Sequence, residues 1–110
     1  MNWISLQSEP QLEEIKEKSK SKAQVIFKHS TRCGISSMVK GRLDKETAPP
    51  ELDFYFLDLL SYRGLSESIA EMFKIYHESP QVLVIKNGEC VYDVSHTGIS
   101  MKEITNQAAW

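Results

Sequence analysis

The sequence predicts an α/β domain in which a four-stranded mixed sheet is covered by helices on both faces. Short runs rich in apolar and β-branched residues, typical of buried strands, alternate with longer segments whose apolar residues recur at helical spacing. Strand–helix–strand order favours parallel pairing with crossover helices. Near the C-terminus, Asn87-Gly88 separates two strand-like runs and predicts a hairpin, which adds an antiparallel edge.

The first predicted element is a helix over 8–20, where Ser8 and Gln11 fit a capping box. The run AQVIFKH, residues 23–29, is apolar on both faces, as expected for a central strand that is covered on both sides. A helix over about 34–46 follows, and the segment TAPPE ends it.

The second half repeats the pattern with a strand over 52–59 and a helix over 64–77. After the hairpin, Ser100 and Glu103 fit a capping box that opens a last short helix. Residues 2–6 could add a short fifth strand. This order of strands and helices is the thioredoxin-like arrangement.

Length and composition restrict the function classes. With 110 residues we expect one domain over 1–110, long enough to bury a core without metal or disulfide bonds. A net charge of −2 gives no electrostatic case for nucleic-acid or membrane binding. We expect no signal peptide and no membrane span. Two cysteines are no disulfide framework, so we expect reduced thiols and a cytoplasmic protein.

Cys33 stands where the predicted central strand gives way to a helix. At that position unpaired backbone N–H groups and the positive helix end favour a thiolate, the reactive form of cysteine. The adjacent Arg32 can add positive potential. The alternative, a cysteine that only packs in the core, is disfavoured by the polar neighbours in STRCGISS. We therefore predict that Cys33 is a redox nucleophile.

Ser36 stands three residues after Cys33, where a dithiol Cys-x-x-Cys motif has its second cysteine. In a dithiol site the second thiol attacks the mixed disulfide and expels the substrate, which a hydroxyl cannot do. A mixed disulfide at Cys33 must therefore wait for an outside thiol. We expect Ser36 either to donate a hydrogen bond to the Cys33 sulfur or to act only as a good N-terminal helix residue.

Ser79-Pro80 directly precedes a predicted strand, at the place where thioredoxin-like folds carry a cis-proline. A cis bond there would bring the Ser79 backbone beside Cys33, where it could pair with an extended substrate as in strand addition. Ser-Pro turns are common, so the argument rests on their combination with Cys33 and the strand order. We assign Ser79 and Pro80 to substrate binding.

Cys90 and His29 are the other residues that could take part in the redox chemistry. Cys90 follows the hairpin turn, and we expect it to have no redox role because the hairpin should lie at the sheet edge, away from Cys33. His29 is either a catalytic base or, as we favour, a side chain packed beside the sheet. The histidines and cysteines lack metal-ligand spacing, so no metal site and no bound cofactor are expected.

The stretches FKHSTRCGIS and HESPQVLVIKNGECVYDVSHTGIS resemble the YtxJ-like monothiol bacilliredoxins, a branch of the thioredoxin superfamily. The family pattern is a strand ending in Lys-His-Ser, then Thr-Cys-Pro-Ile-Ser, and later His-Glu-Ser-Pro-Gln. The resemblance spans almost the whole chain and implies removal of bacillithiol, the co-substrate, from S-bacillithiolated proteins. It implies Cys33 as the attacking nucleophile and Ser36 in the place of the missing partner. Because bacillithiol carries a malate group, Arg32 could attract its carboxylates.

Two positions depart from the family pattern. Arg32 directly precedes the cysteine, and Gly34 replaces the usual proline, which restores a backbone N–H near the sulfur and loosens the turn. The resulting Cys-Gly-Ile-Ser is one residue from the Cys-Gly-Phe-Ser of monothiol glutaredoxins, which bridge a [2Fe-2S] cluster between two subunits with glutathione. Against that alternative, SHTGIS follows the hairpin in place of their glycine pair and acid.

A third alternative is a non-enzymatic binding module that holds a partner in a groove at Ser79-Pro80. Such a module has no need for a thiol at a helix start. The sequence therefore predicts a monothiol thiol-disulfide oxidoreductase that releases a low-molecular-weight thiol from S-thiolated proteins. Only the resemblance identifies that thiol as bacillithiol.

Overall fold

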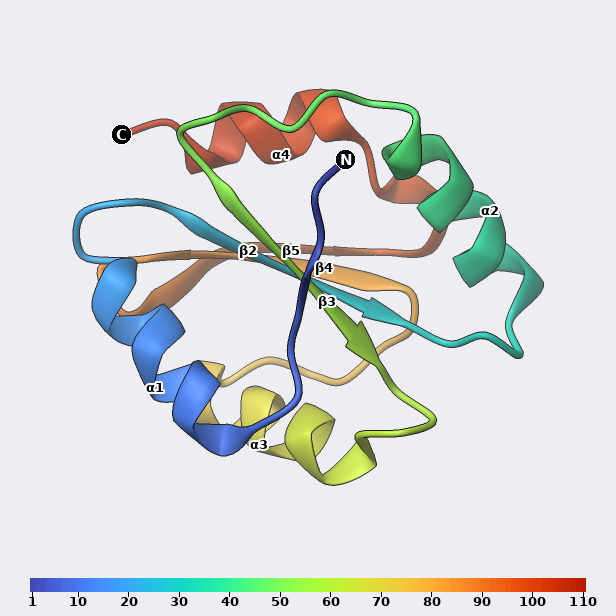
Figure 1. The fold of residues 1–110 in the computed structure, drawn as a ribbon, viewed down its shortest axis with the longest axis horizontal. Coiled ribbons are helices and arrows are strands. Elements are labelled where there is room, and N and C mark those ends of the chain that lie inside the picture. Colours follow the sequence, from blue (N-terminus) through green and yellow to red (C-terminus); the bar gives the residue numbers. More distant parts are fainter.

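The computed structural model describes all residues, 1–110, and shows a five-stranded mixed sheet between two layers of helices (Figure 1). In chain order the elements are β1 (Ile4–Ser5), α1 (Glu9–Lys18), β2 (Gln24–His29), α2 (Gly34–Asp44), β3 (Asp53–Asp58), α3 (Arg63–Phe73), β4 (Gln81–Lys86), β5 (Glu89–Ser95), a 3₁₀ turn (His96–Gly98) and α4 (Met101–Ala108).

The strands lie in the order β1-β3-β2-β4-β5. Strand β2 is central, because it pairs in parallel with β3 and antiparallel with β4. Strand β5 forms one edge as the second arm of the hairpin, and β1 forms the other edge in parallel with β3. The mixed sheet is confirmed, and so is the short fifth strand near the N-terminus.

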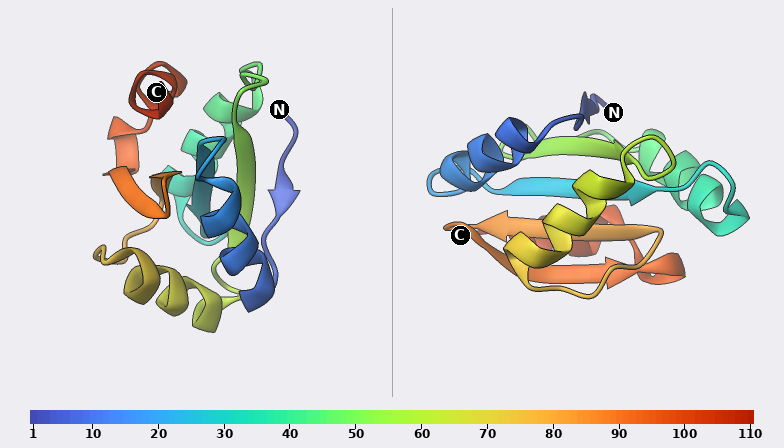
Figure 2. Two further views of the ribbon diagram at one scale, coloured as in Figure 1. Left: turned by 90° about the vertical axis from the view of Figure 1, so that its left-hand side faces the viewer. Right: turned by 90° about the horizontal axis from the view of Figure 1, so that it is seen from below.

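Both faces of β2 are covered, which explains its continuous apolar run. Helices α1 and α3 cover one face, and α2 and α4 cover the other (Figure 2). Ile26 belongs to the core on the α1/α3 side, whereas Val25 and Phe27 belong to the core on the α2/α4 side. Because side chains alternate along a strand, Lys28 points to the α1/α3 side and His29 to the α2/α4 side.

The hairpin turn has the conformation that its sequence predicts. Asn87 and Gly88 both have positive φ, 53° and 77°, as a two-residue type I′ turn requires. Ser19, just after α1, accepts their N–H groups with its backbone and side-chain oxygens. The turn is therefore held against the end of α1.

Two predicted capping residues are also in place. Ser8 and Gln11 form the capping box of α1, and the Ser100 hydroxyl accepts the N–H of Glu103 at 3.2 Å at the start of α4. None of the four helices has the length and apolar character needed to cross a membrane.

The helix predicted over 64–77 is shorter in the structure and ends at Phe73. Lys74 adopts a left-handed conformation, with φ 55° and ψ 50°, which stops the helix. The segment that follows leaves the helix and returns to the sheet, where it brings the His77 ring to the buried Lys28 side chain. The helical pattern of the sequence runs on past the true end of α3, because the spacing of apolar residues does not report the backbone conformation of Lys74.

Candidate active site

Cys33 is the N-cap residue of α2, at the end of the turn that follows β2. Its own N–H donates to the carbonyl of Ser30 at 3.1 Å, which fixes the turn. The N–H groups of Gly34, Ile35 and Ser36 have no backbone partner, so they form the unpaired first turn of the helix. The cysteine is partly exposed and reachable by another thiol. The geometry is therefore that of an accessible sulfur beside a ring of free N–H donors, as predicted.

Ser36 is fully buried beneath this turn. Its hydroxyl accepts the N–H of Ser30 at 3.0 Å and lies 2.6 Å from His29 Nδ1, the acceptor for its proton. The expected hydrogen bond to the Cys33 sulfur is not formed, because these two partners use the hydroxyl. Ser36 thus joins the start of α2 to the end of β2 instead of contacting the nucleophile.

His29 packs beside the sheet, which is the interpretation favoured from the sequence. Its ring lies 5.8 Å from that of Phe27 and 5.4 Å from that of Phe56, between centroids. Burial, and secondly the positive charge of Lys40, lower the pKa of His29. The imidazole is therefore neutral at pH 7, with Nδ1 free to accept the Ser36 proton.

Ser36→Ala is expected to lower the free energy of unfolding by about 1–3 kcal/mol, because it leaves the Ser30 N–H and His29 Nδ1 unpaired in a buried place. Turnover at Cys33 should stay within severalfold of wild type. Urea unfolding and a dethiolation assay measure the two effects. Ser37→Ala, an exposed neighbour, is the control and should change neither. Full stability with lost activity would contradict this structural role.

The Ser79–Pro80 peptide bond is cis, as the sequence predicted. Ser79 makes no backbone hydrogen bond, whereas the Pro80 carbonyl accepts the N–H of His96 at 2.9 Å. The Ser79 hydroxyl is buried without a partner. Ser79 therefore offers three polar groups, N–H, carbonyl and hydroxyl, that the fold itself does not use.

Arg32 and Gly34 flank Cys33 on the surface. Arg32 forms no hydrogen bond or ion pair within the protein, so its charge is available to a ligand. Gly34 is the first residue of α2, and its free N–H is the backbone donor that a proline would lack. A Cβ at Gly34 would meet no atom within 4 Å, so neither space nor backbone strain requires glycine there.

Cys90 is far from Cys33. It pairs with Ile85, which in turn pairs with Gln24 at the first residue of β2, whereas Cys33 follows the end of β2. At about 3.3 Å per residue, strand β2 alone separates the two cysteines by roughly 16 Å, far beyond the ~7 Å limit between Cα atoms for a disulfide. Burial raises the pKa of the Cys90 thiol to about 11, so it stays protonated.

Cys90→Ala is therefore expected to retain the wild-type dethiolation rate within about twofold, since neither distance nor protonation lets Cys90 resolve a disulfide at Cys33. Steady-state kinetics of the variant measure this. The mass of oxidised wild type gives a second check, because an internal disulfide would appear as a loss of two hydrogen atoms. A tenfold slower variant would contradict the monothiol arrangement.

The sequence did not single out a polar cluster on the other side of β2. Lys28 is fully buried, and its Nζ lies 3.2 Å from His77 Nδ1. The Ser66 hydroxyl of α3 lies 3.1 Å from the same nitrogen. Burial lowers the pKa of Lys28 to about 8, and burial followed by the Lys28 charge lowers the pKa of His77. The signal was present as a single lysine inside an apolar central strand.

Comparison with known proteins agrees with this geometry. The family model described as monothiol bacilliredoxin BrxC matches residues 4–104. The chain belongs to this family. Among solved structures, a candidate oxidoreductase with a thioredoxin fold is 31% identical to this bacilliredoxin chain and superposes with a TM-score of 0.83, covering 96% of this chain and 93% of its own.

Thioredoxins share the fold at lower identity. The Malassezia sympodialis thioredoxin Mala s 13 has 19% identity and a TM-score of 0.79, with 98% of this chain and 92% of its own covered. Thioredoxin f2 of Chlamydomonas reinhardtii has 14% identity and a TM-score of 0.72, with 96% and 92% covered. These matches confirm the predicted thioredoxin-like fold. Together with the family they support a thiol oxidoreductase function.

Proposed function

We propose that the protein is a monothiol oxidoreductase that removes bacillithiol from S-bacillithiolated proteins. The observation that carries this proposal is the accessible Cys33 at the unpaired start of α2, with a buried serine, Ser36, where a resolving cysteine would stand. Family membership supports bacillithiol as the small thiol. The two alternatives fit less well. A non-redox module does not need the thiol of Cys33, and a cluster carrier of the glutaredoxin type would have a glycine pair and an acid after the hairpin, which this sequence lacks.

The reaction proceeds in two exchanges. The Cys33 thiolate attacks the bacillithiol sulfur of the mixed disulfide, so that a Cys33–bacillithiol disulfide forms and the protein leaves as a thiolate. A second bacillithiol thiolate then attacks the bacillithiol sulfur of that adduct. The products are bacillithiol disulfide and the Cys33 thiolate, and the released protein thiolate takes a proton from water. One disulfide is consumed and one is formed, so the entering bacillithiol thiol is oxidised while the sulfur of the target protein is reduced to a thiol.

Substrate binding falls to the groups around Cys33. The unpaired backbone of Ser79 supports pairing with an extended segment of the thiolated protein, as in strand addition. The free Gly34 N–H can stabilise the developing thiolate charge. The unpaired guanidinium of Arg32 is suited to a bacillithiol carboxylate.

A turnover assay tests this function. A test protein with one S-bacillithiolated cysteine and the same protein S-glutathionylated are each mixed with catalytic amounts of the enzyme and the matching thiol. We expect many turnovers with bacillithiol and much slower release of glutathione.

Equal rates for both thiols would contradict the assignment of bacillithiol. No release from either substrate, together with visible-range absorbance after anaerobic reconstitution with iron and sulfide, would instead favour the cluster-carrier alternative. If the protein releases neither thiol but still binds a protein partner, the non-redox module would be favoured.

A further inference from the structure

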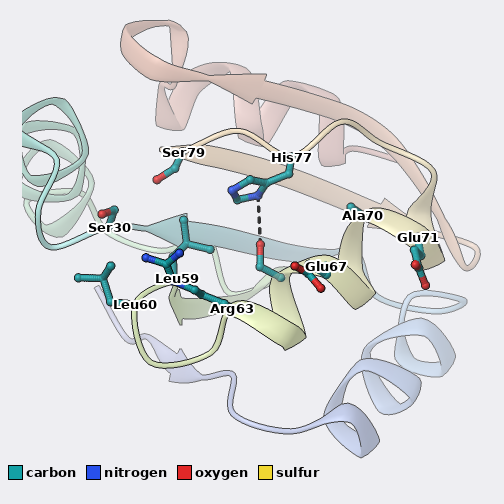
Figure 3. Close-up of a pocket in the computed structure, with 10 residues that line it drawn as sticks. Ser30, Leu59, Leu60, Arg63, Glu67, Ala70, Glu71, His77 and Ser79 are labelled. Carbon is teal, nitrogen blue, oxygen red and sulfur yellow. Dashed lines mark hydrogen bonds between the residues drawn. The ribbon is translucent and has the colours of Figure 1, made fainter.

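A cavity of about 630 Å³ opens between α3 and the segment that leads to Pro80. Its size is typical of a small-molecule site. Figure 3 shows Ser30 at one end, then Arg63, then His77, with Glu67 and Glu71 toward the other end. The cavity therefore changes from cationic to acidic along its length.

The Ser30 end of the cavity adjoins the redox turn. The carbonyl of Ser30 accepts the N–H of Cys33, so this wall of the cavity is part of the turn that carries the nucleophile. Across from Ser30 lies Ser79, whose buried hydroxyl has no partner (Figure 3). A buried hydroxyl without a partner is unfavourable, so this atom is suited to bind a polar group that enters from the cavity.

Arg63 is the first cationic side chain in the cavity wall. Its side chain is exposed and forms no ion pair or hydrogen bond within the protein, although Glu67 stands one helical turn further on the same helix. An unpaired guanidinium in a cavity wall can bind a carboxylate with two parallel hydrogen bonds.

His77 is a second potential donor in the cavity wall, and Lys28 contacts its ring from the protein interior. Because Nδ1 of His77 faces the Lys28 amine and the Ser66 hydroxyl, the other ring nitrogen is the one that faces the cavity. With Nδ1 accepting from the lysine, Nε2 carries a proton and donates. The buried ammonium also raises the positive potential at this wall. A fully buried lysine that forms no ion pair lowers the stability of the folded state. Its presence here is therefore consistent with a functional role.

We propose that this cavity binds the non-reacting, carboxylate-bearing part of the small thiol, with a carboxylate held by Arg63 and His77. The ligand class is a low-molecular-weight thiol whose carboxylate lies several bonds from its sulfur. The inference rests on the proposed function and names where that thiol lies during both exchanges. The carboxylates of Glu67 and Glu71 limit the site, since negative charge that extends past His77 meets them.

The test measures binding apart from catalysis, in the unreactive Cys33→Ser background. Bacillithiol disulfide is titrated into this protein by calorimetry. Adding Arg63→Gln should raise the Kd about tenfold, the loss expected for one charge-assisted contact. Adding Glu67→Gln should lower the Kd severalfold, because it removes an opposing charge. Lys102→Gln, an equal charge change on the exposed side of α4, is the matched control and should leave the Kd unchanged.

Two further readouts make the result specific. The ring resonances of His77 should shift on titration while those of the exposed His96 do not. Cystamine, a disulfide without carboxylates, should bind equally to the Arg63→Gln protein and its parent. Equal Kd values of bacillithiol disulfide for Arg63→Gln and Lys102→Gln, or unmoved His77 signals during binding, would overturn the proposed site. The proposed function would survive that outcome if wild type still releases bacillithiol faster than glutathione, and it would fail if no release occurs or if both thiols are released equally fast.

Discussion

Replacing Cys33 by serine is expected to lower the rate of bacillithiol release on the order of a thousandfold or more, because a hydroxyl stays protonated at neutral pH and cannot form the mixed disulfide. The rate should fall to that of free bacillithiol alone. Steady-state release from an S-bacillithiolated test protein measures this directly.

The substitution is expected to leave the fold intact, so that a lost rate reports on the chemistry of Cys33. Cys33 is the N-cap of α2, and serine is a better N-cap than cysteine since its hydroxyl can accept a helix N–H. We therefore expect equal or slightly higher stability in urea. A Cys33→Ser protein that retains more than about a tenth of the wild-type rate would remove Cys33 from the mechanism.

Replacing Lys28 by methionine is expected to raise the free energy of unfolding at pH 7 by about 2 kcal/mol, because it removes a buried ammonium and keeps the apolar stem. A shift in the pKa of Lys28 from 10.5 to about 8 corresponds to roughly 3 kcal/mol of destabilisation, part of which the substitution regains. Urea unfolding at pH 7 measures the change. A variant that is less stable than wild type would show that the contact with His77 outweighs the burial of the charge.

The pH dependence gives an independent check of this charge. The pKa of Lys28 is lower in the folded chain, so between about pH 8 and pH 10.5 the unfolded chain holds more protons than the folded one. Stability that is lost below this window is therefore regained as the pH rises through it. The difference in unfolding free energy between Lys28→Met and wild type should shrink over the same window. A difference that stays constant with pH would contradict a charged Lys28.

Lys28→Met should also weaken binding of bacillithiol disulfide, because His77 loses the group that orients its ring. A variant that gains stability and loses affinity is the pattern expected of a residue kept for function. Asp93 and Cys90 are the other titratable groups that influence Lys28, and both lie on β5, beyond β4 in the sheet. Cys90→Ala in parallel separates the influence of the thiol from that of the ammonium.

The strands could be predicted because their signals are local. The apolar run of β2 and the Asn87-Gly88 turn each follow from a few adjacent residues, and the structure has both. The same holds for Cys33 at the start of α2, where a buried strand gives way to a polar turn. Those features needed no knowledge of distant contacts.

The missed features depend on contacts between distant segments. The Ser36 hydroxyl was expected to bond to the Cys33 sulfur, but His29 and Ser30 bond to it instead. Spacing along a helix cannot show which other groups compete for a hydroxyl. The Lys28–His77 contact joins residues 49 positions apart, on β2 and in the segment that follows α3. The cavity walls come from three separate segments. Sequence patterns within one element cannot report such contacts.

The most direct test of the account is to find which sulfur carries bacillithiol after one turnover. Reduced wild type is mixed with one equivalent of S-bacillithiolated test protein, quenched with acid, digested and mapped by mass. We predict one adduct on the peptide that contains Cys33, unmodified Cys90, and one free thiol on the test protein for each adduct. An adduct on Cys90, or a disulfide that joins Cys33 to Cys90, would contradict the monothiol mechanism and the distance between these cysteines in the fold.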